Sequence, residues 1–178
     1  ATGGEPLSQP EFLAELFSKA KAQGIHTCLD TSGVTFNPDL HDKIDAVIDS
    51  TDLVMLDIKQ MDSDEHRKLT GHGNENILAF ARYLRDRKIP LWVRRVVVPG
   101  ITDDEGELFR LGEFLSELSN LKALDVLPYH DMGKVKYESL GLEYPLADVP
   151  PLPKEKAVEA REIIMKGIKA GLRKNRNV

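Results

Sequence analysis

Short apolar stretches alternate with longer amphipathic stretches along the chain. The apolar stretches are mostly aliphatic, which is typical of strands in a parallel sheet that helices cover. They predict four strands, at 25–29, 53–58, 91–98 and 123–128. The stretches between them carry apolar residues every three or four positions, the spacing of a helix with one buried face. Strands that alternate with helices in this way indicate an α/β fold with a parallel sheet.

The amphipathic stretches predict five helices with recognisable starts. Ser8 with Glu11, and Thr102 with Glu105, have the spacing of capping boxes. A helix is expected to open near Asn37, and the last one follows the prolines at 150–153. The first helix is expected over 10–23, with its core-facing residues at Phe12, Leu13, Leu16, Phe17 and Ala20.

The length of the chain limits how much of a barrel it can form. The chain has 178 residues, of which 41% are hydrophobic, enough for one domain, 1–178, with a core. A closed eight-fold barrel needs about 250 residues. We therefore expect a partial (β/α) barrel, an arc of about four parallel strands with outer helices.

Composition excludes several classes of protein. The formal net charge is −5 and no basic block interrupts the chain, so a nucleic-acid partner is not expected. No apolar run approaches the ~20 residues of a membrane span, so no membrane partner is expected either. The single cysteine, Cys28, excludes an internal disulfide and fits a reducing cytosol, so we expect a cytoplasmic protein.

Polar residues that could do chemistry stand at or near the ends of the four strands. In barrel folds the C-terminal ends of the strands form one rim, where functional residues gather. The residues found there are Asp30 and Thr31, then Asp57 and Lys59, then Arg94 and Arg95, and finally Tyr129 and His130.

Asp57 and Lys59 form the most informative of these groups. Residues two apart in a strand project from the same face, so this carboxylate and ammonium are expected side by side. Such a pair could bind a zwitterion. It could also be a surface salt bridge worth ~0–1 kcal/mol. A third interpretation makes Lys59 the nucleophile of a Schiff-base aldolase.

Five short motifs, spread over most of the chain, resemble those of a known family. They are Gly3-Gly4-Glu5-Pro6, Leu-Asp-Thr-Ser-Gly at 29–33, Met-Leu-Asp-Ile-Lys at 55–59, Val-Val-Val-Pro-Gly at 96–100 and Leu-Pro-Tyr-His at 127–130. Together they resemble the pyruvate formate-lyase activating enzymes of the radical S-adenosylmethionine superfamily. The resemblance implies a partial barrel of the radical S-adenosylmethionine type whose first strands lie before Ala1, so that the chain is N-terminally truncated.

The resemblance also implies an activity. A reduced 4Fe–4S cluster cleaves S-adenosylmethionine, and a glycyl radical is then generated on pyruvate formate-lyase. The implied cofactors are S-adenosylmethionine, the cluster and a monovalent cation. The implied partners are the glycyl-radical loop of pyruvate formate-lyase and an electron donor such as flavodoxin or ferredoxin.

The resemblance assigns roles to particular residues. Lys59 would meet the carboxylate of S-adenosylmethionine, while Gly3, Gly4 and Glu5 would lie near its amino group. Val96 and His130 would lie near the adenosine portion, and Arg94 would orient substrate or support the barrel interior. The monovalent cation would be held by Asp30, Thr31, Met55 and Asp57, the two aspartates also belonging to the cofactor site.

The chain departs from the family pattern in one respect. The Cys-x3-Cys-x2-Cys segment that binds the cluster is absent, and Cys28 alone cannot supply three thiolates. We therefore expect that the chain by itself binds no cluster, binds S-adenosylmethionine weakly and has no activase activity. An exposed sheet edge is expected to promote self-association. An activase of another glycyl-radical enzyme and a non-catalytic docking fragment stay open as alternatives.

Overall fold

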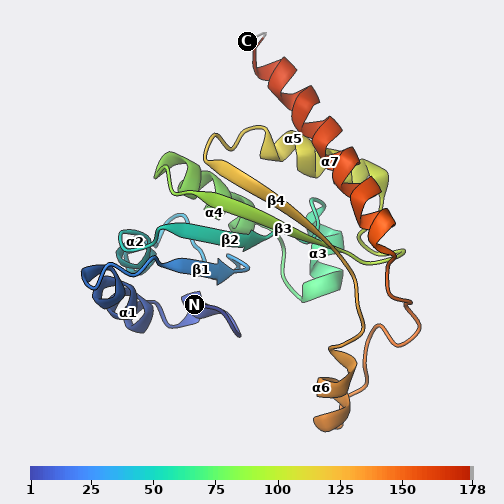
Figure 1. Ribbon diagram of the computed structural model, residues 1–178, viewed down its shortest axis with the longest axis horizontal. Coiled ribbons are helices and arrows are strands. Elements are labelled where there is room, and N and C mark those ends of the chain that lie inside the picture. Colours follow the sequence, from blue (N-terminus) through green and yellow to red (C-terminus); the bar gives the residue numbers. More distant parts are fainter. Residues whose placement is uncertain (177–178) are drawn as a thin grey trace.

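Four parallel strands form a single sheet at the centre of the fold. The computed structural model describes residues 1–176. The strands run in the order β1-β2-β3-β4 (Figure 1). Their bounds are β1 Cys28–Thr31, β2 Leu53–Asp57, β3 Leu91–Val97 and β4 Leu121–Pro128. The predicted α/β fold with about four parallel strands is confirmed.

The first strand begins at Cys28 rather than at 25, and it includes Asp30 and Thr31. At Thr27, just before the strand, the N–H donates to the carboxylate of Asp52 at 2.9 Å, while the carbonyl accepts from Leu53 N at the start of β2. Asp30 and Thr31 therefore point to opposite faces of a strand. This alternation matters for the candidate site.

Helices connect and follow the strands. Two of them, α3 and α6, were not predicted, because α3 is almost entirely polar and α6 has only six residues. The helix expected from Asn37 begins later, since the Asn37 side chain accepts from the backbone of Asp39 in a turn. The helices are η1 Pro6–Ser8, α1 Pro10–Ala22, α2 Asp42–Ile48, α3 Ser63–Thr70, α4 Glu75–Asp86, α5 Glu105–Leu115, α6 Lys134–Ser139 and α7 Lys154–Asn175.

Both predicted capping boxes are wrong. Ser8 lies in η1, and its hydroxyl donates to the Glu5 carbonyl at 2.6 Å instead of capping α1. Helix α5 is capped by Asp104, whose carboxylate accepts from the helix backbone. Thr102 does not cap α5, because its hydroxyl accepts from Val98 N at 2.7 Å. Each hydroxyl is used to hold the turn before the helix.

The two faces of the sheet differ in burial. The face that packs on the helices includes Leu29, Val54, Leu56 and Val93, all 0% exposed and part of one core with helix residues. Residues on the other face alternate with these and are half-buried or exposed. We call this second surface the open face. On β1 to β3 it consists of Cys28, Asp30, Leu53, Met55, Asp57, Trp92, Arg94 and Val96, and β4 adds Ala123, Asp125 and Leu127, which pair with Trp92, Arg94 and Val96.

The expected core face of α1 is only half right. Leu13 and Phe17 are 3% and 4% exposed, but Phe12 and Leu16 are 65% and 44% exposed. Helix α1 packs mainly on α2 beside the edge strand β1, so the helix buries only a narrow stripe of residues at i and i+4.

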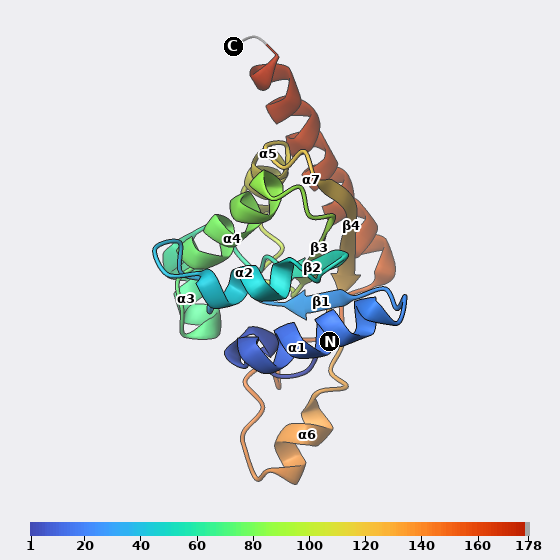
Figure 2. The same cartoon turned by 90° about the vertical axis from the view of Figure 1, so that its left-hand side faces the viewer.

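The segment of residues 131–149, which carries α6, projects from the body of the protein in two views (Figures 1 and 2).

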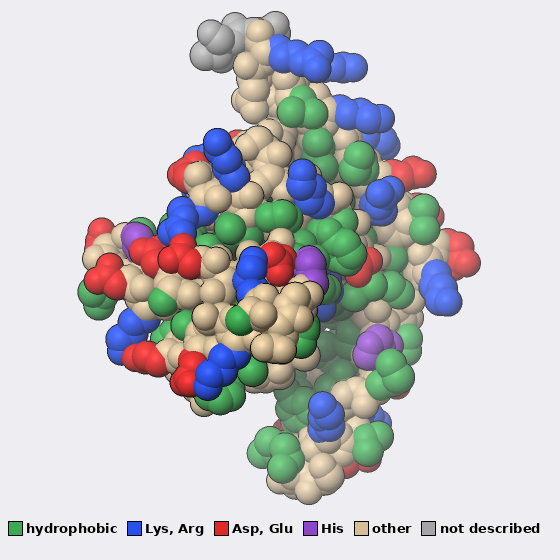
Figure 3. Space-filling model, turned by 60° about the vertical axis from the view of Figure 1, so that its left-hand side comes forward, with side chains coloured by type: hydrophobic (Ala, Val, Ile, Leu, Met, Phe, Trp, Pro, Cys, Tyr) green, Lys and Arg blue, Asp and Glu red, His purple; other side chains and the backbone are tan. Residues whose placement is uncertain are grey.

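The projecting segment also exposes apolar side chains (Figure 3), among them Val135 and Leu140, which are 68% and 71% exposed. No helix among the described residues is long and apolar enough to span a membrane.

Asp52 fixes the N-terminal end of the sheet. Its carboxylate accepts from Lys21 Nζ at 2.7 Å and from both the N–H and the hydroxyl of Thr27. The hydrogen bond from Lys21, followed by those from Thr27, lowers the pKa of Asp52 to about 2. This carboxylate joins α1, the start of β1 and the start of β2.

The pKa of Asp52 predicts an acid-dependent loss of stability. Because the folded pKa lies below the unfolded value of about 3.9, the ionised carboxylate stabilises the fold above that pH and ceases to do so as pH falls toward 2. In denaturant titrations, the free-energy difference between wild type and Asp52→Asn should be constant at neutral pH and shrink between about pH 5 and pH 2. Asp148→Asn, at an exposed position, is the control for the loss of one negative charge. A pH-independent difference for Asp52→Asn would contradict this linkage.

Helices α5 and α7 approach closely through glycine. A Cβ built on Gly112 would meet the backbone carbonyl of Ile164, and one on Gly167 would meet the carbonyl of Phe109. Neither backbone group can move without shifting a helix. The two helices lie side by side in both ribbon views (Figures 1 and 2).

Gly167→Ala is expected to destabilise the protein by about 2 kcal/mol, because overpacking against backbone forces α7 away from α5. Thermal unfolding should show the change as a lower Tm. Gly133→Ala is the matched control, since a Cβ there meets nothing within 4 Å and the backbone has φ −67°. Equal melting temperatures for the two variants would show that the helices can separate at little cost.

Candidate functional site

A guanidinium joins two carboxylates on the open face. Arg94 Nε donates to Asp57 Oδ1 at 2.6 Å, and its Nη2 donates to Asp30 Oδ1 at 2.8 Å. The strand register explains the meeting, because Asp57 pairs with Arg94 directly and Asp30 lies on β1, one strand further. All three side chains are between 21% and 23% exposed. The pKa of Arg94 is raised, first through its hydrogen bond with Asp57.

Lys59 extends this group beyond the end of β2. Its Nζ lies 3.1 Å from Asp57 Oδ2, and its side chain is 39% exposed. The expectation that Asp57 and Lys59 share a face is confirmed. The four groups Asp30, Asp57, Lys59 and Arg94 form one ion-pair network, which we call the charged cluster. The cluster contains two cationic and two anionic side chains. The ammonium and the carboxylate of a zwitterion could therefore replace existing ion-pair partners within it.

The glycine loop lies against the same strand ends. Gly3 and Gly4 have φ of +94° and +58°, and nothing lies within 4 Å of a Cβ built on either. Thr2 Oγ1 donates to Asp30 Oδ2 at 3.0 Å, which brings the loop to the charged cluster. Thr2 was missed by the sequence analysis; its position directly before two glycines was the only available signal.

Glu5 holds the other end of this loop. Its carboxylate accepts from Thr31 Oγ1 at 2.5 Å, from the backbone and the hydroxyl of Ser32, and from Leu7 N. The hydrogen bonds of this carboxylate are therefore made to other residues of the protein rather than to a ligand. Glu5 fixes the glycine loop to the end of β1, and the loop supplies exposed backbone groups.

The residues suggested for a monovalent cation divide between the two faces. Asp30, Met55 and Asp57 belong to the open face, whereas Thr31 is 3% exposed and its hydroxyl donates to Glu5. The Thr31 hydroxyl is thus turned away from the other three. Among the described residues, no group of three or more His, Cys, Asp or Glu side chains could hold a metal ion.

Val96 and His130 come after the residues of the charged cluster in the sequence. Val96 lies on the open face, two residues after Arg94 on β3, and is 38% exposed. His130 is exposed and follows β4, directly after Tyr129, whose N–H donates to the Val97 carbonyl. Neither side chain joins the ion-pair network.

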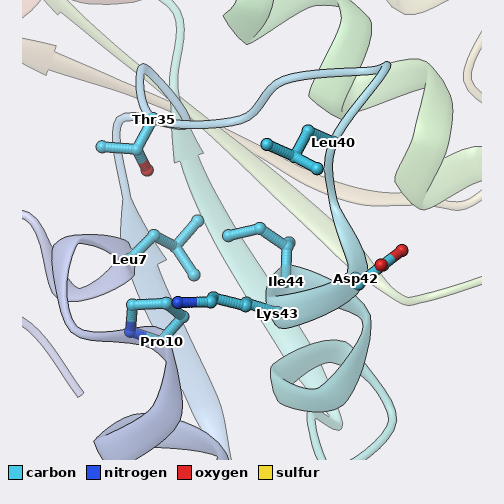
Figure 4. Close-up of a pocket in the computed structure, with 7 residues that line it drawn as sticks. All are labelled: Leu7, Pro10, Thr35, Leu40, Asp42, Lys43 and Ile44. Carbon is cyan, nitrogen blue, oxygen red and sulfur yellow. The ribbon is translucent and has the colours of Figure 1, made fainter.

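The charged cluster lies on an open surface rather than in a cavity. A cavity of about 390 Å³ lies between the start of α1 and the start of α2 (Figure 4). It contains none of the candidate residues and is lined by Leu7, Pro10, Thr35, Leu40, Asp42, Lys43 and Ile44. Lys59 borders a smaller cavity of about 190 Å³, beside Ser32 and His66.

The chain offers suitable groups for an amino-acid ligand but not for an iron–sulfur cluster. Carboxylates, a lysine and exposed glycine backbone complement an α-amino and α-carboxyl group. A four-iron cluster takes several cysteine thiolates, whereas this chain has one, Cys28, and burial raises the pKa of its thiol.

Comparison with known proteins gives a consistent picture. Pyruvate formate-lyase-activating enzymes from Staphylococcus epidermidis and Streptococcus mutans are 48% and 45% identical to this chain, over 89% and 92% of its length. The chain spans 63% of the length of each. A crystal structure of a domain of the pyruvate-formate lyase-activating enzyme from Bacteroides vulgatus superposes with a TM-score of 0.73 at 26% identity, covering 93% of this chain and 91% of that domain.

A family model, described as the radical SAM superfamily, matches residues 1–112. These residues include the glycine loop, strands β1 to β3 and every member of the charged cluster. The chain therefore belongs to the radical S-adenosylmethionine superfamily.

Proposed function

We propose that this chain is the S-adenosylmethionine-binding part of an enzyme that activates pyruvate formate-lyase by generating a glycyl radical. The observation that carries the proposal is the charged cluster on the open face, with the glycine loop tied to it through Thr2. Superfamily membership and the two activating-enzyme relatives support it.

In this proposal the chain binds and orients its cofactor. Lys59 binds the α-carboxylate, since its ammonium is the most exposed cation of the cluster. The carbonyls of Gly3 and Gly4 accept from the α-amino group. Arg94 keeps Asp30 and Asp57 in place, and Val96 and His130 meet the adenosine portion. When bound and reduced, S-adenosylmethionine supplies the hydrogen-atom acceptor for a glycine of pyruvate formate-lyase.

Further parts of the proposal concern groups outside this chain. The electron would come from a 4Fe–4S cluster held by cysteines of a longer polypeptide, fed by a flavodoxin or ferredoxin in the cytoplasm. A monovalent cation beside Asp30, Met55 and Asp57 would compete with Arg94 and Lys59 for the two carboxylates. The 178 residues would form one domain, and the open face would promote self-association of the isolated chain, because Trp92 and Val96 are 41% and 38% exposed there.

The proposal is tested in two arms. The complete gene product that contains this chain should generate a glycyl radical signal on pyruvate formate-lyase in electron paramagnetic resonance, only with S-adenosylmethionine and a reductant. The isolated chain should bind S-adenosylmethionine with a Kd of roughly 0.1 mM or weaker and take up no four-iron cluster during anaerobic reconstitution. A radical that forms on another glycyl-radical enzyme and not on pyruvate formate-lyase would reassign the partner. No radical on either would reject the proposal.

A further inference from the structure

A buried arginine, Arg95, forms hydrogen bonds to the segment that carries Lys59, on the side opposite to the open face. Arg95 follows Arg94 in β3, points to the opposite face of the sheet, and is 1% exposed. Its guanidinium donates to the Ile58 carbonyl and to Gln60 Oε1, each at 3.3 Å, and to the Thr102 carbonyl at 2.8 Å. The two residues that flank Lys59 in the chain are thus both fixed by one side chain.

Three more buried polar side chains hold the same segment. Gln60 Nε2 donates to the Ile101 carbonyl at 2.7 Å, and Asn74 Nδ2 donates to the carbonyls of Gln60 and Met61 at 2.9 and 2.8 Å. Glu107 accepts from the backbone N–H of Met61 at 2.9 Å. Gln60, Asn74 and Glu107 are 4%, 3% and 6% exposed. We call Gln60, Asn74, Arg95 and Glu107 the polar clamp.

None of these contacts involves the side chain of Lys59, which is hydrogen-bonded to Asp57 on the open face. The polar clamp therefore immobilises the backbone on both sides of Lys59 and leaves its ammonium free to meet a ligand. A group held in one geometry before binding loses less entropy when the ligand arrives.

Stability alone gives a poor reason for Arg95. Burial lowers the pKa of Arg95 to about 10, so the folded state disfavours the charge that this side chain carries at neutral pH. Its Nε has no hydrogen-bond partner among the described residues. Replacing every member of a buried ionic group with apolar residues of similar volume is often neutral or stabilising, whereas the loss of Arg95 alone leaves the Ile58 and Thr102 carbonyls without this donor.

We propose that Arg95 is a positioning residue for Lys59, acting through the Ile58 carbonyl and the Gln60 side chain to hold the ammonium over the open face. This inference rests on the proposed function, in which Lys59 binds the carboxylate of S-adenosylmethionine.

The test compares Arg95→Met with Arg95→Lys, each alone and in a Lys59→Met background. S-adenosylmethionine is titrated into each protein by NMR, and amide hydrogen exchange is followed at Met61 and Asp62. We expect Arg95→Met to weaken binding about fivefold, to speed exchange at both amides and to lower the Tm, because the buried carbonyls of Ile58 and Thr102 lose a donor. Arg95→Lys keeps one cationic donor and should recover part of both effects, and it also serves if Arg95→Met fails to fold.

In the Lys59→Met background, Arg95→Met should cause no further loss of affinity, because the group that it positions is gone. An equal loss in both backgrounds, or unchanged affinity in Arg95→Met, would overturn the positioning role alone. Unchanged affinity in Lys59→Met would instead remove the carboxylate role that the proposed function gives to Lys59, and the positioning role with it.

Discussion

Lys59→Met should weaken binding of S-adenosylmethionine by about ten- to a hundredfold, because a hydrogen bond to a charged group contributes about 1.5–3 kcal/mol. Lys59 is the most exposed cation of the charged cluster, at 39%, and its Nζ already faces the carboxylate of Asp57 at 3.1 Å. A ligand carboxylate can approach the same ammonium from solvent. Methionine keeps most of the length of the side chain, so packing changes little.

Titration calorimetry or NMR titration measures the effect. Lys19→Met is the matched control: Lys19 lies on α1 with its side chain 75% exposed, and its partner is Glu15 on the same helix. The control should bind like the wild type at every ionic strength. Binding that is equally strong in wild type and Lys59→Met would remove the carboxylate role of Lys59.

Much of the candidate site could be predicted from sequence because it depends on alternation within strands. Asp57 and Lys59 are two residues apart, so they share a face, and the structure joins them. Arg94 stands at the corresponding point of the next strand, and parallel register brings it to Asp57. The charges of these residues and their spacing within each strand are therefore enough to predict that they lie on one face.

Other features depend on contacts between distant segments, which local patterns do not contain. Thr31 was grouped with Asp30, yet the strand turns its hydroxyl to the other face, where Glu5 binds it. Arg95 was grouped with Arg94 at the end of the third strand. Side chains at adjacent strand positions point to opposite faces, however, so Arg95 belongs to the buried polar clamp.

The same limit applies to the helices. α3 has one buried residue, His66, so the apolar periodicity that revealed the other helices is missing there. Its start is nevertheless marked by Asp62, which caps it through two backbone N–H groups. A search for caps without apolar faces would have found it.

Arg94→Met should have the largest combined effect on stability and binding, since it removes the guanidinium that bridges Asp30 and Asp57. The wild-type guanidinium bonds to both carboxylates, and these are about four-fifths buried. Breaking a buried ion pair costs about 3–5 kcal/mol, and partial exposure places this case near about 3 kcal/mol. Two neighbouring carboxylates would then repel each other and push apart β1 and β2 below the glycine loop. S-adenosylmethionine binding should fall at least about tenfold as the cluster loses its geometry.

A second substitution separates charge repulsion from loss of packing. If repulsion dominates, Arg94→Met with Asp57→Asn should regain a substantial part of the lost stability in denaturant titrations, because only one carboxylate then remains. High salt should also reduce the penalty of Arg94→Met, since ions screen exposed parts of the pair. The double variant should still bind S-adenosylmethionine weakly, because Asp57 is also the partner of Lys59. A single variant Arg94→Met with wild-type stability and affinity would show that the charged cluster does not organise the open face.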